Sequence, residues 1–444
     1  MRHPDDRPVL LIADKNGTIS EFPELLMSGM SNGNFLLPDL QDLIPLPKGS
    51  ELFALPGRLP IGWDPAANEP VVLTENPFTG GLVQAVAAFM APAHTAIFSS
   101  SYQTETAGPT LPLFSYTAVG WYRGKFWVAG FRSDEDTRQD ANQFRQSTID
   151  SRTRKKLKNH KDNRLIQHLG KCCLTYGCPA ARNYFLGRWE APLPTSPTCN
   201  ARCLGCISLQ PSGCCPSTQD RITFVPSVKE LTEIAIPHLE ATENPIVSFG
   251  QGCEGEPLLQ TEVISRSIQA IRSHTTKGTI NLNSNASLPL SVARLAEAGL
   301  DSIRVSLNSA QEIYYNAYYR PQNYCFSDVM RSIDAMKDKD RFVSLNYFIL
   351  PGFTDSEQEF TALCRLLAAH RPDFVQLRNL NIDPEWYLKS LSFPKSKQTL
   401  GIRHWLDRLQ AEFPLLRFGY FNPSIPANSS NFRCFLKKTE YYSK

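Results

Sequence analysis

The second half of the chain alternates short apolar runs with longer amphipathic runs. Apolar residues at consecutive or alternate positions are typical of strands, and apolar residues every three or four positions are typical of helices. The predicted strands span residues 188–193, 245–249, 279–285, 302–307, 342–350, 374–380 and 415–421. The predicted helices span residues 228–239, 258–274, 289–298, 327–337, 356–370 and 405–413. Repeated strand-then-helix units predict an α/β fold, a partial parallel (β/α)6-type barrel with right-handed crossovers.

The first part of the chain has a different pattern. Over residues 1–132, proline and glycine recur and helical periodicity is poor, which predicts a β-rich domain. The clearest element is a hairpin whose arms, residues 116–122 and 125–131, flank Arg123-Gly124. One helix is expected at residues 81–90. No catalytic group of residues is evident in this part.

A chain of 444 residues is too long for one compact core. We predict four parts: the β-rich domain at 1–132, a charged linker with a cysteine-containing helical segment at 133–186, the barrel at 187–385, and an extension at 386–444. The net charge of +3 favours no class of partner. The apolar runs at 9–13 and 82–98 are too short or too polar for a signal peptide or a membrane span. We therefore expect a cytoplasmic protein with no membrane contact.

Cysteine is the residue type that changes this picture most. Eight of the 12 cysteines lie between Cys172 and Cys215, and in a reducing compartment such clustering indicates metal binding rather than disulfides. Cys199, Cys203 and Cys206 lie within eight residues, directly after the first predicted barrel strand. Thiolates are the ligands that iron–sulfur clusters and zinc prefer. The spacing favours a four-iron cluster with one iron free of protein ligands, and the alternative is a structural zinc site completed by Cys214 or Cys215.

Polar residues follow every predicted barrel strand, where the functional residues of such barrels lie. Gly255 and Glu256 follow the second strand and offer close backbone approach and an acceptor for an amino group. Ser306 and Asn308 suit sugar hydroxyls, and Arg304 or Arg320 suits a ligand carboxylate. Further candidates for substrate contact at the sixth strand end are Arg378, Asn379 and Asn381.

Two other features have a functional and a structural interpretation. Six of the ten residues from Arg152 to Lys161 are basic, which suits RNA, but a solvated helical linker is the favoured interpretation. An auxiliary metal site could draw on Cys172, Cys173, Cys178, Cys214 and Cys215. Cys253, beside Glu254, is interpreted as a ligand, a redox or hydrogen-donating thiol, or a small packed residue, the last being preferred.

The C-x3-C-x2-C loop at the start of a β/α series resembles the radical S-adenosylmethionine (SAM) superfamily. Gly255-Glu256-Pro257-Leu258-Leu259 is similar to that family's Gly-Gly-Glu-Pro segment. Further similarities lie in residues 280–285, 298–308, 319–321 and 349–352. The segment before Gly255 is longer than the family pattern, so the choice between Glu254 and Glu256 as the SAM contact stays open.

The resemblance implies that Cys199, Cys203 and Cys206 bind a [4Fe–4S] cluster whose fourth iron binds SAM. Reductive cleavage would give a 5′-deoxyadenosyl radical that abstracts hydrogen from an unidentified substrate, with electrons from an external flavodoxin- or ferredoxin-like donor. The SAM contacts that it implies are Gly255, Glu256, Asn283, Arg304, Ser306, Asn308, Arg320 and Leu350. A second iron–sulfur cluster is a further hypothesis. The alternatives are an RNA-modifying member that docks RNA through Arg152–Lys161, and a non-catalytic zinc or iron–sulfur scaffold.

Overall fold

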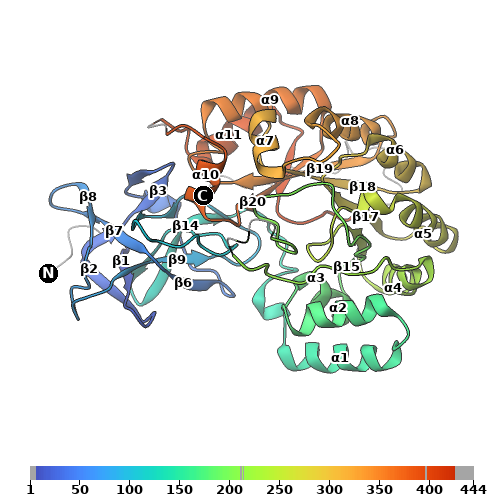
Figure 1. The fold of residues 1–444 in the computed structure, drawn as a ribbon, viewed down its shortest axis with the longest axis horizontal. Coiled ribbons are helices and arrows are strands. Elements are labelled where there is room, and N and C mark those ends of the chain that lie inside the picture. The colour runs from blue at the N-terminus through green and yellow to red at the C-terminus, as the bar shows by residue number, and fades with distance from the viewer. Residues whose placement is uncertain (1–6, 211–212, 214, 396–397, 426–444) are drawn as a thin grey trace.

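The computed structural model describes residues 7–210, 213, 215–395 and 398–425 (Figure 1). An antiparallel sheet, blue in Figure 1, lies beside a parallel sheet surrounded by helices. The predicted fold class is confirmed. Among the described residues, no helix combines the length and the apolar character needed to cross a membrane.

The N-terminal part consists of antiparallel strands. They are β1 (Val9–Ala13), β2 (Ile19–Met27), β3 (Gly29–Ser31), β4 (Asn34–Leu36), β5 (Leu43–Pro45), β6 (Glu51–Leu55), β7 (Arg58–Asp64), β8 (Glu69–Val72), β9 (Gln84–Phe89), β10 (His94–Ala96), β11 (Ser99–Ser100), β12 (Tyr102–Thr104), β13 (Val119–Tyr122) and β14 (Lys125–Arg132). The main path of the larger sheet runs β10-β14-β13-β1-β2-β7-β12. Short 3-10 turns lie at Leu40–Asp42 and Ala141–Gln143.

The predicted hairpin is present, and the predicted helix at 81–90 is wrong. In the hairpin of β13 and β14, Arg123 and Gly124 have φ angles of 48° and 75°, as a two-residue type I′ turn requires. The expected helix is strand β9, which pairs with β6 and β1. Alanines Ala85, Ala87 and Ala88 are all buried, so both faces of the strand are covered and the alternation that marks a strand is hidden.

Three helices connect the two sheets and confirm the helical character predicted for residues 133–186. They are α1 (Gln146–Asn159), α2 (Arg164–Leu174) and α3 (Pro179–Leu186). The side chain of Asn163 caps α2, and Gly187, with φ of 67°, ends α3. The predicted boundaries between the four parts of the chain stay a prediction.

The barrel sheet has its strands in chain order, all parallel. They are β15 (Glu190–Pro192), β16 (Ile246–Phe249), β17 (Thr279–Ser284), β18 (Ser302–Leu307), β19 (Phe342–Ile349), β20 (Phe374–Asn379) and β21 (Arg417–Gly419). The helices are α4 (Val228–Ala241), α5 (Thr261–His274, after a 3-10 turn at Pro257–Gln260), α6 (Pro289–Ala298), α7 (Glu312–Tyr319), α8 (Phe326–Lys337), α9 (Glu357–His370), α10 (Pro384–Ser390) and α11 (Ile402–Glu412). Helices α7 and α10 were not predicted.

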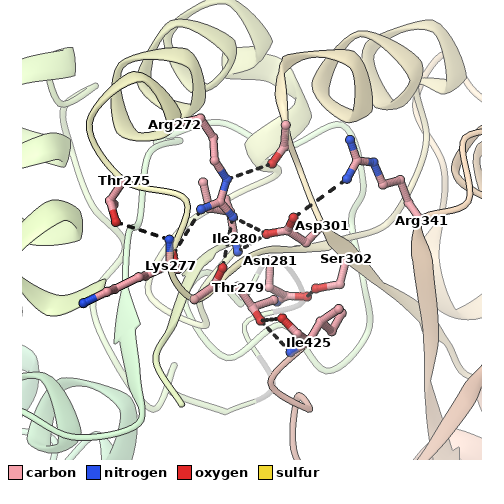
Figure 2. A network of polar contacts seen from close by, with 12 residues as sticks. Arg272, Thr275, Lys277, Thr279, Ile280, Asn281, Asp301, Ser302, Arg341 and Ile425 are labelled. Atoms are coloured by element: carbon pink, nitrogen blue, oxygen red, sulfur yellow. Dashed lines mark hydrogen bonds and ion pairs between the residues drawn. The ribbon is translucent and has the colours of Figure 1, made fainter. Parts of the chain in front are cut away.

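A polar network closes the end of the barrel where the strands begin (Figure 2). Asp301, just before β18, accepts a 2.7 Å hydrogen bond from the backbone N–H of Ile280 and pairs with Arg272 of α5. Ile425 donates its N–H to Thr279 Oγ1 at 2.7 Å. These contacts fix the N-terminal ends of β17 and β18, so the functional residues are expected at the opposite end.

The N-terminal sheet contacts that opposite end. Arg58 of β7 and Asp383 form an ion pair at 2.9 Å, with side chains only 3% and 2% exposed. Asn379, at the end of β20, accepts from the N–H of Ala96 at 2.9 Å and donates to the carbonyl of His94 at 3.0 Å. The first part of the chain therefore lies over the strand ends that carry the candidate site.

Candidate active site

The cysteine loop lies between β15 and α4 and is held by main-chain bonds to the end of α7. The N–H groups of Arg202 and Leu204 donate to the carbonyls of Tyr319 and Tyr318 at 2.9 and 3.0 Å. The N–H of Gln322 donates to the carbonyl of Asn200 at 2.8 Å. Because these contacts are between backbones, they fix the path of the loop whatever its side chains bind.

A second set of backbone bonds ties the loop to the Gly-Glu-Pro segment after β16. Gly255 donates its N–H to the carbonyl of Ser196 at 2.7 Å, and Glu256 donates to that of Thr198 at 2.8 Å. A Cβ on Gly255 would lie 1.9 Å from the Thr198 oxygen, so only glycine permits this approach. The residue before Cys199 is thus held by the segment that was predicted to bind SAM.

The thiols of Cys199, Cys203 and Cys206 are free and partly buried. Burial raises the pKa of Cys199 to about 11 and that of Cys203 well above its usual value. A guanidinium nitrogen of Arg221 lies 3.4 Å from the Cys206 sulfur. Three thiols in one short loop that main-chain bonds hold fit a thiolate-ligated metal centre.

The two glutamates between which the sequence left the SAM contact open differ in their hydrogen bonds. Glu254 accepts four hydrogen bonds, from the N–H groups of Thr195, Ser196 and Gln251 and from the Thr195 hydroxyl, at 2.7 to 3.1 Å. Three of these bonds reach Oε2 and one reaches Oε1, so Glu254 receives one more donor from its own chain than Glu256 does. Burial raises its pKa to about 7. Through these contacts Glu254 joins the turn at Gln251 to the residues Thr195 and Ser196 before the cysteine loop.

Glu256 is also buried, and burial raises its pKa to about 7. It accepts three hydrogen bonds, from Leu258 N–H at 3.0 Å, Ser284 Oγ at 2.5 Å and Asn285 N–H at 2.9 Å. Its Oε2 receives only the last of these, so one acceptor position is left for a ligand donor. Of the two carboxylates, Glu256 is the one that fits an amino group.

Residues at the ends of β17 and β18 form the neighbouring wall. Asn283 Oδ1 accepts from Asn281 at 2.9 Å, and Ser306 is partly buried. Asn308 is fully buried and donates to the Tyr314 carbonyl and the Tyr387 hydroxyl, both at 3.1 Å. Asn308 lies beyond the last residue of β18, so the alternation of side chains along this strand does not by itself place Asn308 on the same face as Ser306.

Several buried polar atoms have no hydrogen-bond partner within the described part of the chain. They include Arg304 Nε, Asn308 Oδ1, Tyr319 OH and Asn346 Oδ1. Buried polar groups are normally paired, so unpaired atoms at the ligand end of a barrel fit a polar ligand such as SAM. The residues present therefore fit both the cluster and the nucleotide.

The remaining predicted contacts divide into three groups. Leu350 is buried, and its N–H donates to Thr354 Oγ1 at 2.9 Å. Arg320 and Asn381 are exposed, so neither is brought into the buried part of the site. Asn379 uses its amide oxygen and nitrogen on β10, which gives it a structural role instead of the predicted substrate contact.

The barrel interior itself is polar, with contributions from neighbouring strands. Asn422 Nδ2 donates to Glu190 of β15 at 2.9 Å, and its Oδ1 accepts from Gln376 of β20 at 2.9 Å. Arg304 of β18 lies 3.4 Å from Gln376 Oε1. Burial and the charge of Arg378 lower the pKa of Arg304 to about 10. The interior thus places two guanidinium groups near each other.

The candidate auxiliary cysteines differ in their contacts. Cys172 lies 3.6 Å from His168 Nε2, and Cys173 contacts Thr153 at 3.4 Å. Cys178 is at the N-terminus of α3, Cys215 is partly buried, and Cys214 lies outside the described residues. Cys253, 4% exposed, lies beside Cys172.

Sequence reasoning missed the residues that support the cysteine loop. Tyr315, Tyr318 and Tyr319 of α7 form buried ring contacts, with centroids 4.5 and 4.9 Å apart. Their one-turn spacing was a helical signal that could have been used. The contact of Arg221 with Cys206 joins two residues that are 15 positions apart, and no sequence pattern predicts it.

Comparison with known proteins finds a family match in the barrel segment. Residues 193–364 match the family model described as the Radical SAM superfamily. This part of the chain is therefore similar to that superfamily, whose members are enzymes that cleave SAM reductively at an iron–sulfur cluster. No curated protein matches the chain.

Solved structures give distant similarities. The [FeFe]-hydrogenase maturase HydG from Carboxydothermus hydrogenoformans is 14% identical, with 62% of this chain and 70% of that chain covered and a TM-score of 0.36. SuiB from Streptococcus suis bound to S-adenosylmethionine is 14% identical, with 55% and 54% covered and a TM-score of 0.38. A radical SAM methyltransferase from Sphaerobacter thermophilus is 16% identical, with 52% and 66% covered and a TM-score of 0.36. The chain spans about half the length of SuiB, and likeness at this level carries no argument about substrate.

Proposed function

We propose that this chain is a radical SAM enzyme in which Cys199, Cys203 and Cys206 bind the [4Fe–4S] cluster and Glu256 accepts the amino group of SAM. The observation that carries the proposal is the pair of backbone bonds that join Gly255 and Glu256 to the residues just before Cys199. They couple the thiol loop to Glu256, the buried carboxylate of this segment that receives fewer donors from the chain. When bound, the cluster and SAM supply reductive SAM cleavage and hydrogen abstraction from the substrate.

The chain's own residues then have separable tasks. Glu256 would accept from the ammonium group of SAM, whose positive charge favours the ionised carboxylate. Asn308 Oδ1 and Ser306 would accept from ribose hydroxyls. Tyr318 and Tyr319 cover the cysteine loop with buried rings and limit water near it.

The substrate is proposed to carry an anionic group, a carboxylate or a phosphate. Arg304 is buried in the barrel interior with an unpaired Nε, and the charge of Arg378 is near enough to lower its pKa. Arg378 is oriented by the Tyr420 carbonyl at 3.3 Å and lies over the Tyr420 ring, 4.0 Å from its centroid. Two guanidinium groups in one interior would be stabilised by a shared anion.

The other expectations drawn from the sequence stay predictions. An external flavodoxin- or ferredoxin-like donor would supply electrons, and a cytoplasmic location is expected. A second iron–sulfur cluster stays a hypothesis. RNA docking is not favoured, because Arg152 donates to the Leu186 carbonyl and the ammonium of Lys156 lies 3.8 Å from the Tyr184 ring centroid. Part of the basic run is therefore used in packing.

The test is an anaerobic assay of SAM cleavage by the purified full chain. Iron, sulfide and 5′-deoxyadenosine are measured after reduction with dithionite or flavodoxin in the presence of SAM. We expect about four irons per chain and 5′-deoxyadenosine formation. A variant with Cys199, Cys203 and Cys206 all replaced by alanine should lose both. An intact cluster that yields no 5′-deoxyadenosine with several reductants would overturn the proposal.

The anionic substrate is tested with cell extract separated by anion exchange. We expect that fractions retained by the resin stimulate 5′-deoxyadenosine formation, and that deuterated substrate transfers deuterium to it. Arg378→Gln should weaken this stimulation about tenfold or more, because one of two charge-assisted contacts is removed. Stimulation confined to unretained, uncharged fractions would reject an anionic substrate without affecting SAM cleavage.

A further inference from the structure

His168, Cys172 and Cys253 bring three metal-ligating atoms together outside the cysteine loop. His168 and Cys172 are one helical turn apart on α2, and Cys253 belongs to the loop after β16. Their ligand atoms all lie within 4.8 Å of one another. The nitrogen and sulfur of the pair on α2 are 3.6 Å apart.

These distances fit one metal ion. With Zn–S bonds of about 2.3 Å and Zn–N bonds of about 2.0 Å, ligand atoms at tetrahedral angles lie roughly 3.5 to 3.8 Å apart. The measured 3.6 Å between Cys172 Sγ and His168 Nε2 matches the nitrogen–sulfur separation. Thiolates on different irons of a cluster must lie farther apart, because an iron–sulfide core separates them.

The surroundings also suit a metal centre. Cys172 and Cys253 are 1% and 4% exposed, whereas His168 is partly exposed. The N–H of Cys178 donates to the Cys172 carbonyl at 3.1 Å, which brings a third cysteine beside the group. Two thiolates and an imidazole are the donor set that zinc prefers, and Cys178 or a water completes four ligands.

We propose that His168, Cys172 and Cys253 bind one mononuclear metal ion of the zinc class, which fastens α2 to the loop after β16. Binding releases the two thiol protons and transfers no electron. Cys253 directly precedes Glu254 and is three residues before Glu256. The ion would therefore stabilise the segment that holds the cysteine loop, without taking part in the reaction.

The experiment uses the full chain with Cys199, Cys203 and Cys206 replaced by alanine, so that the main cluster cannot contribute metal. The protein is purified anaerobically, incubated with Zn²⁺ and desalted, and zinc, iron and sulfide are measured. We expect about one zinc per chain with no sulfide. Replacing Zn²⁺ with Co²⁺ should give thiolate-to-cobalt charge-transfer absorption.

Cys253→Ser in this background should reduce bound zinc at least about tenfold and remove the cobalt–thiolate bands. The matched control is Cys173→Ser, a neighbouring buried thiol that contacts Thr153 and should keep the metal. If far-UV circular dichroism shows that Cys253→Ser does not fold, His168→Gln tests the partly exposed ligand instead. The absence of stoichiometric zinc, iron bound together with sulfide, or zinc retained in both ligand variants would each overturn the proposal. None of these outcomes bears on SAM cleavage, because the background lacks the main cluster.

Discussion

Gly255→Ala tests whether the Gly-Glu-Pro segment controls the cysteine loop. The new Cβ would lie 1.9 Å from the Thr198 oxygen and 2.4 Å from its carbonyl carbon. Real Cβ atoms essentially never come within 3.0 Å of another heavy atom, and both neighbours here are backbone atoms. The two segments must therefore separate by about 1 Å, since no side chain can rotate away.

The cost can be worked from the two hydrogen bonds that span this contact. The bonds from Gly255 to Ser196 and from Glu256 to Thr198 are 2.7 and 2.8 Å long, and both would be stretched or broken. At roughly 1 kcal/mol net for each bond and about 1–3 kcal/mol for overpacking, we expect about 3–5 kcal/mol of lost stability in this region. A displacement of about 1 Å next to Cys199 should lower SAM cleavage roughly 100-fold.

The assay compares iron content, SAM binding and 5′-deoxyadenosine formation in the anaerobic protein. Gly252→Ala is the matched control in the same loop, because its Cβ would meet only side-chain atoms of Gln219 and Ile207 that can move. We expect the control to retain iron and activity within about threefold. A Gly255→Ala enzyme with normal iron content and normal SAM cleavage would refute the coupling between the two segments.

Three further predictions concern charge. Burial raises the pKa of Glu254 from 4.5 to about 7, so the folded protein binds this proton more tightly than the unfolded chain does. The free energy of unfolding should therefore fall by about 3 kcal/mol as the pH rises from about 4.5 to 7. Glu254→Gln should flatten the pH dependence of urea unfolding, and parallel curves for the variant and the original protein would contradict this. Arg58→Met leaves the buried Asp383 without its cation and should lower the free energy of unfolding, measured by thermal or chemical unfolding, by about 3 kcal/mol. A loss below about 1 kcal/mol would argue against a stabilising ion pair. Arg221→Gln removes the donor 3.4 Å from the Cys206 sulfur and should make the cluster's reduction potential more negative in a spectroscopic redox titration, and an unchanged potential would show that this contact does not tune the cluster.

The barrel could be predicted because each of its elements shows its period in the sequence. Strand β18 and helix α6 occupy the predicted residues, because apolar positions alternate with partly exposed ones in β18 and Gly299, with φ of 111°, ends α6. Strand β9 was predicted as a helix because it is buried on both faces. Helix α7 was missed because its tyrosines have only moderate helix propensity and are held by contacts with the cysteine loop.

The candidate site could be predicted in part, because some of its information is absent from local sequence. The three-cysteine spacing is local, so it was found. The choice between Glu254 and Glu256 as the SAM contact depends on how many donors reach each carboxylate. The donors to Glu254 come from the loop before the cysteines, and those to Glu256 come from the end of β17. The proximity of Cys172 to Cys253 likewise depends on where α2 packs.

These long-range contacts also explain why the site would act as one unit. The residues before Cys199 contact both glutamates: Thr195 and Ser196 donate to Glu254, and Thr198 accepts from Glu256. Any change that moves the segment from Gly250 to Glu256 therefore moves the cysteine loop as well. If one metal ion holds Cys253 to α2, it stabilises that same segment from the other side. Loss of this ion should then lower the temperature at which SAM binding is lost. The initial rate of SAM cleavage at low temperature should change less, because the ion restrains the loop and touches no reacting atom.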